Sequence, residues 1–527
     1  MSLSNLYLTT ALACTTACMF GYGTGYIGGV LALPSFTHYF GLDTLPPNAR
    51  AAAESFTISL WLLGALLGVL TAIPVCSRLG RARALTLCAG TYTLGAALQA
   101  VPPSHSLAFF NTGRLVNGIG VGAGTLATPI YIAEIATPDT KGVLLAAWQV
   151  SMQGAALVGF WGGYISHTTI ENGVHWQWRL PVLFQVVFGV ILVVAGCGVL
   201  PESPVWLGAV GRREECRGVL QWLREEDSTN QSASLALGAE VEACCRRDLG
   251  GDDNDTPVKK SEALYAALSG SANLRRRLLC GVGLMALMTL SGSNALNFYA
   301  PTIFASAGFT STSASLLLTG TFGLVKLGAS LGFMFCFVRI KGHRFWLLLC
   351  TAICAVSFAV LAFCVRQLEP HDSNHDGATS SPLLSAIAVL AVYTFAFFFG
   401  IGHGPIAWNF CAEIFPPRLS ASCCAITTCT QWVFQIVNAI LTPFLLTLVG
   451  WYTWVIFCGV NVFLFVWSAA YIPETRGLPM GVEMERVFER GSLLSWGKKG
   501  RKYGYGYGLQ TGDAEREPLL GNRGGDV

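Results

Sequence analysis

Long apolar stretches recur along almost the whole chain, and this repetition constrains the fold more than any other feature. A helix needs about 20 apolar residues to cross the roughly 30 Å hydrocarbon core of a bilayer. Stretches of about this length lie at residues 8–33, 55–76, 84–101, 107–133, 143–166, 180–200, 277–306, 313–338, 345–365, 382–411, 419–449 and 451–472. The sequence therefore predicts an all-α membrane protein with twelve transmembrane helices in two groups of six.

The composition supports a lipid bilayer as the surroundings of this chain. Charged residues make up 12% of its 527 residues, which is about half the share found in a soluble domain. The net charge of +3 is too small to indicate nucleic acid as a partner. The 18 cysteines are scattered, many of them in apolar runs, and no spacing typical of metal ligands occurs. We therefore expect no metal site and no cofactor.

One long polar segment, residues 201–276, divides the chain into an N-terminal bundle at 1–200 and a C-terminal bundle at 277–475. The charged stretches of this segment are typical of short amphipathic helices that lie at a membrane surface. The last part of the chain, residues 476–527, is rich in glycine and charge. We expect this tail to be mostly disordered after about residue 490.

Lysine and arginine gather in the loops on one side of the predicted bundle. Arg78, Arg81 and Arg83 follow the second apolar stretch, and Lys341 and Arg344 follow the eighth. Because loops rich in lysine and arginine stay in the cytosol, both termini are predicted to be cytosolic. The sequence thus indicates a multi-pass protein, which we expect in the plasma membrane.

The two halves of the chain repeat one another. The triplets Leu79–Arg81, Ala133–Ile135 and Pro201–Ser203 return as Lys341–His343, Ala412–Ile414 and Pro473–Thr475. Such internal repeats are typical of secondary transporters, which bind their solute between the repeats near the middle of the membrane. No constellation of nucleophile, metal ligands or phosphate loop indicates an enzyme.

Six motifs carry a resemblance to a known family. They lie at Phe20–Gly29, Gly113–Gly122, Pro201–Leu207, Gly292–Phe304, Gly404–Trp408 with Glu413, and Pro473–Gly477. Together they resemble the motifs of the sugar porters of the major facilitator superfamily, and those of the fungal hexose and quinate carriers most closely. The resemblance extends from about residue 10 to residue 490. It implies two pseudo-symmetric six-helix bundles and a carrier that works by alternating access.

The resemblance also implies that the solute is a monosaccharide, either a hexose or a pentose, or a related polyol. It places solute contacts at Gln149, Asn294, Trp408, Trp432 and Gln435. Amide side chains can donate to and accept from sugar hydroxyls, and aromatic rings cover the apolar side of a sugar ring. The family usually has two adjacent glutamines in span 7, where this chain has Met288 and Thr289. This change favours a bulkier or less hydroxylated solute than an ordinary hexose.

A further departure concerns proton coupling. Proton-coupled members of the family carry an aspartate at the position of Gly23, and Arg114 is the residue that would pair with it. Because glycine cannot titrate, we predict facilitated diffusion. Lys326 adds a second cation within span 8. The two cations leave a quinate-like organic acid or a secondary metabolite as an alternative solute.

By resemblance, ion pairs between helix ends close the carrier on its cytosolic side. The residues of this predicted gate are Arg83, Glu134, Glu202, Arg344, Glu413 and Glu474. The family's acidic residues shortly before Gly80 and Gly342 are missing here. A weakened gate leaves a non-transporting sugar sensor as a further alternative.

Overall fold

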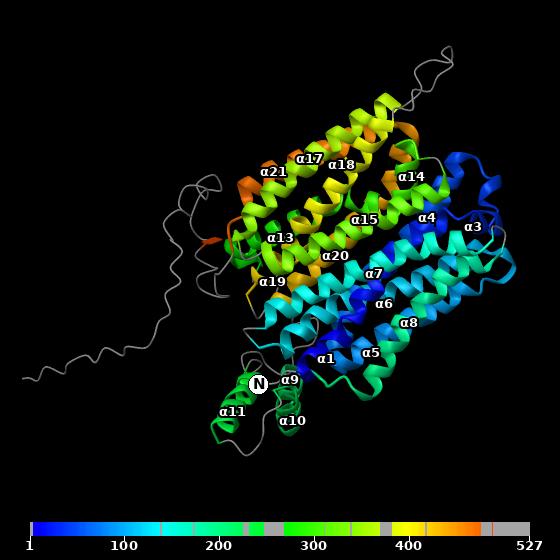
Figure 1. The fold of residues 1–527 in the computed structure, drawn as a ribbon. Helices are drawn as coiled ribbons and strands as arrows, with labels where there is room; N and C mark the ends of the chain where they lie inside the picture. The colour runs from blue at the N-terminus through cyan, green and yellow to red at the C-terminus, as the bar shows by residue number, and fades with distance from the viewer. Residues whose placement is uncertain are drawn as a thin grey trace, which may run out of the picture.

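The computed structural model describes residues 4–137, 140–171, 174–224, 231–246, 268–309, 311–337, 340–368, 382–416, 419–475 and 487–488. Within these residues the regular structure is helical and no strand is formed. The long helices run side by side and make an elongated bundle (Figure 1). The predicted all-α fold is confirmed.

The N-terminal half supplies six spans. The first is divided by a turn at Cys14 into α1 (Ser4–Ala13) and α2 (Thr15–Leu31). The others are α4 (Pro47–Leu79), α5 (Arg81–Ala100), α6 (Leu107–Ile135), α7 (Lys141–Thr169) and α8 (Trp176–Gly198). Short helices α3 (Pro34–Tyr39), η1 (Leu42–Thr44) and η2 (Pro103–His105) lie in the connections.

The C-terminal half also supplies six spans, and three of them are composite. The composite spans are α13 (Ala272–Leu290) with α14 (Ser293–Ser306), α15 (Thr312–Gly332) with the π-helical turn η3 (Phe333–Phe337), and α18 (Pro382–Ile401) with α19 (His403–Glu413). The remaining three are α17 (His343–Leu368), α20 (Ser420–Leu448) and α21 (Tyr452–Tyr471).

Ten helical segments of the described chain are long and apolar enough to cross a membrane. The other two spans are α2, which the break at Cys14 shortens to 17 residues, and α5, which has 20 residues. Both are packed inside the N-terminal half, α2 against α7 and α5 against α6 and α8. The described helices thus fit the twelve predicted spans.

The two halves differ in how their helices pack. In the N-terminal half α4 and α6 touch backbone to backbone: a Cβ on Gly122 would stand 1.9 Å from the carbonyl oxygen of Ala65. In the C-terminal half the chain breaks at Gly292, whose φ of 99° strains any residue with a side chain. A second break, at Gly402, separates α18 from α19. Broken helices of this kind flank the solute sites of many transporters.

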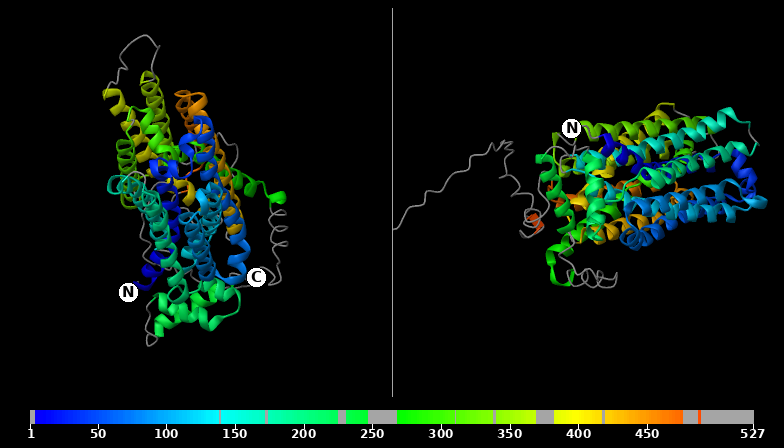
Figure 2. Two further views of the ribbon diagram at one scale, coloured as in Figure 1. Left: turned by 90° about the vertical axis from the view of Figure 1, so that its right-hand side faces the viewer. Right: turned by 90° about the horizontal axis from the view of Figure 1, so that it is seen from below.

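Helices α9 (Pro204–Ala209), α10 (Arg213–Arg224) and α11 (Gln231–Arg246) lie at one end of the bundle, here called the linker end (Figures 1 and 2). Cys216 and Leu220 of α10 pack on Trp206 of α9 and Leu237 of α11. The described parts of the segment 201–276 are largely helical, while its residues 225–230 and 247–267, and the tail predicted to be disordered after about residue 490, lie outside the described residues. The apolar faces of these helices cover one another.

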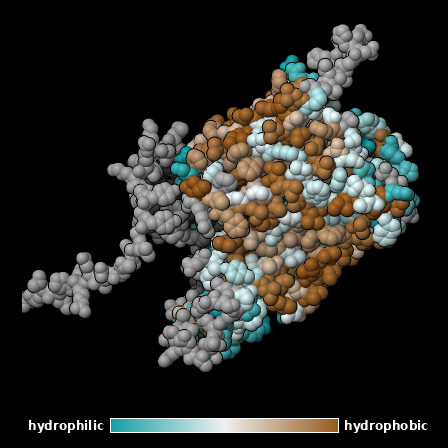
Figure 3. Space-filling model, in the orientation of Figure 1, coloured by the Kyte–Doolittle hydropathy of each residue, from teal (hydrophilic) through white to brown (hydrophobic). Residues whose placement is uncertain are grey.

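The flank of the bundle is apolar and its two ends are polar (Figure 3). Large apolar side chains such as Leu70, Val194 and Leu390 are exposed on the described helices. A soluble protein rarely exposes so much contiguous apolar surface. This distribution is the one expected of a multi-pass membrane protein.

Candidate functional site

A small cavity lies between the two halves, on the side of the linker end. It is lined by Leu145, Ala146, Trp148, Gln149, Ser330, Phe333, Met334, Pro405, Trp408 and Asn409. α7 of the N-terminal half supplies one wall, and α15, η3 and α19 of the C-terminal half supply the other. Its volume of about 30 Å³ has room for only about two water molecules. The cavity is therefore too small for a monosaccharide in this conformation.

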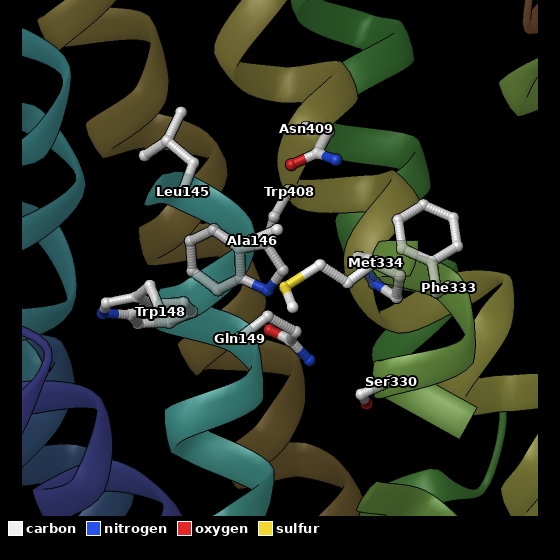
Figure 4. A pocket seen from close by; sticks show the side chains of 10 residues that line it. Leu145, Ala146, Trp148, Gln149, Ser330, Phe333, Met334, Trp408 and Asn409 are labelled. Atoms are coloured by element: carbon white, nitrogen blue, oxygen red, sulfur yellow. The ribbon is translucent and has the colours of Figure 1, made fainter. Parts of the chain in front are cut away.

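Two of the predicted solute contacts meet in this cavity. Figure 4 shows Gln149 of α7, Met334 of η3 and Trp408 of α19 projecting into the same space. The ring of Trp408 also contacts that of Trp148, at 5.7 Å between centroids. The side-chain amide of Gln149 lies beside Gly404. A Cβ added to this glycine would stand 3.4 Å from Nε2 of Gln149. An amide and an indole from opposite halves can thus contact one small solute.

Three further predicted contacts surround the break between α13 and α14. Met288, Thr289 and Asn294 are all buried there. The hydroxyl of Thr289 donates to the carbonyl of Met285 at 2.7 Å. The carbonyl of Thr289 accepts from the amide of Asn438 at 2.7 Å. In this conformation Thr289 is therefore engaged within the helix break.

The predicted contacts of α20 lie against the N-terminal half. The ring of Trp432 stands 5.3 Å from that of Phe20 and 6.1 Å from that of Trp61. The indole N–H of Trp432 and the amide oxygen of Gln435 are buried and make no hydrogen bond within the described residues. The amide oxygen of Gln431 is likewise buried and makes no hydrogen bond within the described residues. Buried polar atoms without a partner are uncommon, and a solute hydroxyl could satisfy them.

An aromatic ring occupies the space beside Gly23. A Cβ at Gly23 would stand 2.6 Å from Cζ2 of Trp61, so the ring leaves no room for an aspartate side chain. The guanidinium of Arg114 lies over the same ring, at 5.1 Å from its centroid. Arg114 also donates to the hydroxyl of Tyr26 at 3.1 Å. The buried arginine is thus held by π faces and a phenol where the resemblance would lead one to expect a carboxylate.

The second buried cation belongs to the C-terminal half. The Nζ of Lys326 in α15 donates to Oδ1 of Asn297 in α14 at 2.8 Å. It also lies 5.5 Å from the ring centroid of Phe322. No Asp or Glu forms an ion pair with Lys326 within the described part of the chain.

The halves touch at the end opposite the linker end. The hydroxyls of Ser55 in α4 and Tyr299 in α14 both donate to the carbonyl of Ala439 in α20, at 3.2 and 2.9 Å. A Cβ on Gly28 would stand 2.5 Å from the carbonyl oxygen of Phe298. The bundle is therefore closed at this end.

Charged residues of the N-terminal half form a compact cluster at the linker end. Arg81 pairs with Glu134 at 2.8 Å, and the hydroxyl of Ser203 donates to the same carboxylate. Glu202 accepts from the backbone N–H of Arg81 at 2.6 Å, so it caps the first turn of α5. The predicted Arg83 is exposed, and Arg81 makes the ion pair in its place.

The C-terminal half has the same helix cap, made there by Glu474, but a histidine occupies the position equivalent to Arg81. Glu474 accepts from the backbone N–H of His343 and Arg344 at 2.9 and 3.2 Å. His343 stands where the first half has Arg81. Arg344 donates to the carbonyl of Ala469 at 2.7 Å. Burial raises the pKa of the Glu413 carboxyl to about 7, while the charge of Lys141 on α7 opposes this shift and that of Glu474 adds to it.

Several residues of this arrangement were not among the predicted ones, and they include Trp61, Arg81, Asn297 and Gln431. Arg81 sits beside a predicted residue, and the repeat with His343 marked its position. Asn297 lies within the motif Gly292–Phe304, and Gln431 adjoins Trp432. Trp61 is one apolar residue in an apolar stretch, and no pattern in the sequence distinguishes it.

Twelve spans in two repeated halves, with a polar and aromatic cavity between them, define a membrane carrier of the major facilitator class. The chain belongs to the sugar porter family: it matches the family described as "Sugar (and other) transporter" over residues 9–488. Nothing in this class indicates an enzyme.

Similar proteins include fungal permeases. A "Probable quinate permease" of Neosartorya fischeri is 30% identical over 486 residues, which cover 92% of this chain and 87% of the relative. One of Aspergillus clavatus is also 30% identical, with 92% and 88% covered. The solved structure of the proton:xylose symporter XylE with 6-bromo-6-deoxy-D-glucose has a TM-score of 0.73 at 21% identity, covering 93% of this chain and all of that one. The last similarity shows the shared fold.

Proposed function

We propose that the chain carries a small polyhydroxylated solute, a monosaccharide or a related polyol, across a membrane by alternating access. The observation that carries this proposal is the cavity between the halves, where Gln149 and Trp408 approach each other from opposite sides. The unsatisfied polar atoms of Trp432 and Gln435 offer further donors and acceptors for hydroxyls. Because the bundle is closed at one end and has only a small cavity toward the other, this conformation suits a nearly occluded state of such a cycle.

The proposed transport is facilitated diffusion. Proton symport through span 1 requires a group there that binds and releases a proton, and Gly23 offers none. Trp61 fills the adjoining space and takes part in holding the charge of Arg114. A downhill carrier needs only a difference in solute concentration to drive net flux.

Uptake into proteoliposomes tests both parts of the proposal. We expect saturable uptake of labelled glucose by the purified full chain, unchanged by an inward proton gradient. Gln149→Ala should raise the apparent KM about tenfold, because one amide hydrogen-bonding position is lost. Stimulation by the gradient would contradict facilitated diffusion, and binding without counterflow would indicate a sensor.

A second candidate solute is a hydroxylated organic acid of the quinate type. Lys326 favours it, because this cation lies within the membrane span without an ion pair in the described chain. The two quinate permeases to which the chain is similar support the same candidate. Replacing glucose by labelled quinate in the uptake measurement compares the two candidates directly.

We further propose that the linker end faces the cytosol and that the protein resides in the plasma membrane. The support is the excess of arginine and lysine at that end, including Arg78, Arg81 and Lys341. Labelling of a single cysteine introduced at exposed Arg83 by a membrane-impermeant thiol reagent tests the orientation. In intact cells this position should stay unlabelled.

A further inference from the structure

Lys326 is a buried cation, and the described helices that pack against its own helix hold no carboxylate. Its side chain is 5% exposed. Helices α7, α14 and α18 and the turn η3 pack against α15, and none of these five elements contains an Asp or a Glu. Their titratable groups besides Lys326 are Lys141, His167, Cys336 and three tyrosines, Tyr164, Tyr299 and Tyr393. No negative charge therefore faces the ammonium group from these elements.

Such a cation is expensive to keep within a membrane span. Moving an ammonium group out of water costs several kcal/mol unless a counter-charge or several hydrogen bonds replace the hydration. Lys326 has three N–H groups when charged, and one of them is used by the amide oxygen of Asn297. The ring of Phe322 supplies a weak further contact. The arrangement leaves hydrogen-bonding capacity for an anionic ligand.

Lys326 and its partner Asn297 lie close to the interface between the two halves. One turn along α15, the hydroxyl of Ser330, which lines the cavity, donates to the carbonyl of Lys326 at 3.1 Å. On α14, Asn297 stands one turn after the predicted solute contact Asn294. The carbonyl oxygen of Asn297 would lie 3.6 Å from a Cβ on Gly28 of the opposite half. The Lys326–Asn297 pair thus lies between the small cavity and the closed end.

We infer that Lys326, oriented by Asn297, binds the carboxylate of a hydroxylated organic acid carried by this protein. The ammonium group donates to the carboxylate, and the amides and indoles of the cavity contact the hydroxyls. This inference rests on the proposed function as a solute carrier and selects the acid among its candidate solutes.

Equilibrium binding to the purified full chain tests the inference without requiring transport. The probes are labelled quinate and its methyl ester, which keeps the hydroxyls and lacks the charge. We expect the wild type to bind quinate about 10- to 100-fold more tightly than the ester. Lys326→Met should abolish this preference and leave binding of the ester unchanged, whereas Lys326→Arg should keep part of it.

Two further measurements separate a binding role from a structural one. Lys326→Met should melt at the same temperature as the wild type or higher, because it removes a costly buried charge. Lys341→Gln, which removes an exposed lysine at the linker end, serves as the matched control and should bind like the wild type. Equal binding of acid and ester by the wild type, binding of neither, or undiminished quinate binding by Lys326→Met would each overturn the inference. Binding without uptake would instead refute the carrier proposal alone.

Discussion

The two halves share one topology but differ in how they hold charge and backbone near the site. In the N-terminal half, Arg114 is fixed by Tyr26 and Trp61, and α7, which lines the cavity, is unbroken. In the C-terminal half, two spans break at Gly292 and Gly402. The buried Lys326 there donates a hydrogen bond to the side-chain amide of Asn297. From this comparison we infer that the N-terminal half is the rigid part of the carrier, called the platform below. The C-terminal half, with its broken spans, changes conformation around the solute.

The largest expected effect concerns the rigidity of the platform. Gly122→Ala puts a methyl group within 1.9 Å of the carbonyl oxygen of Ala65, and backbone cannot move aside as a flexible side chain can. We expect a cost at or above about 3 kcal/mol, the upper end of usual overpacking, and little folded protein. Size-exclusion chromatography in detergent measures the yield. Gly459→Ala, which meets no atom within 4 Å, should express normally.

The next effect concerns the space beside Gly23. Gly23→Asp alone should lower uptake at least about tenfold, because its side chain collides with Trp61 and displaces a ring that holds Arg114. Together with Trp61→Ala, the new carboxylate should pair with Arg114, and uptake should then respond to an inward proton gradient. Trp61→Ala by itself is the control and should show no such response. A double variant that ignores the gradient would argue against the role given to this position.

A smaller effect distinguishes the linker-end clusters of the two halves. Arg81→Gln leaves the half-buried Glu134 without its cation and should destabilise the protein by about 1–2 kcal/mol. Arg344→Gln removes a bond to the carbonyl of Ala469 and should cost less. Exposed Arg83→Gln should have almost no effect on the melting temperature. Equal losses of stability for Arg81→Gln and Arg344→Gln would show that the two clusters do not differ in this way.

The smallest effect is a dependence on pH. Glu413 is the last residue of α19 and lies two residues beyond the apolar part of this span, Pro382–Cys411; burial raises its pKa to about 7. A raised carboxyl pKa means that the folded chain holds the proton more firmly than the unfolded chain does. Its stabilising contribution is therefore complete below about pH 4.5 and is lost as the pH rises through 7. Glu413→Gln should flatten the melting temperature between pH 5 and about pH 7.5, whereas Asp43→Asn at an exposed site should not.

Much of the fold could be predicted because a bilayer forces a simple pattern on the sequence. About 20 apolar residues make one span, and the repeated triplets align the two halves. The sequence did not predict the breaks at Cys14, Gly292 and Gly402. The hydropathy of a broken span matches that of a continuous one, since a break changes the backbone and leaves the composition unchanged.

The site residues were predictable in two ways. Lys326 could be selected because a charged side chain is unusual in a membrane span, whereas Gln149 and Trp408 were placed by the resemblance to the family. The role of Trp61 depends on which side of α4 meets α2, and this packing is decided by tertiary contacts. Arg81 and Arg83 differ only in their direction on the first turn of α5, so the family motif alone did not choose between them.

Within the described residues, α9 and α10 at the linker end are hydrogen-bonded to the N-terminal half and pack against its helices α6 and α1. The indole of Trp206 donates to the carbonyl of Ser77, Arg224 to that of Ile135, and the amide of Asn5 to that of Trp222. α9 and α10 should therefore travel with the N-terminal half during a transport cycle. A nanobody raised against this pair of helices would then serve as a handle for imaging, adding mass to the protein without arresting its motion.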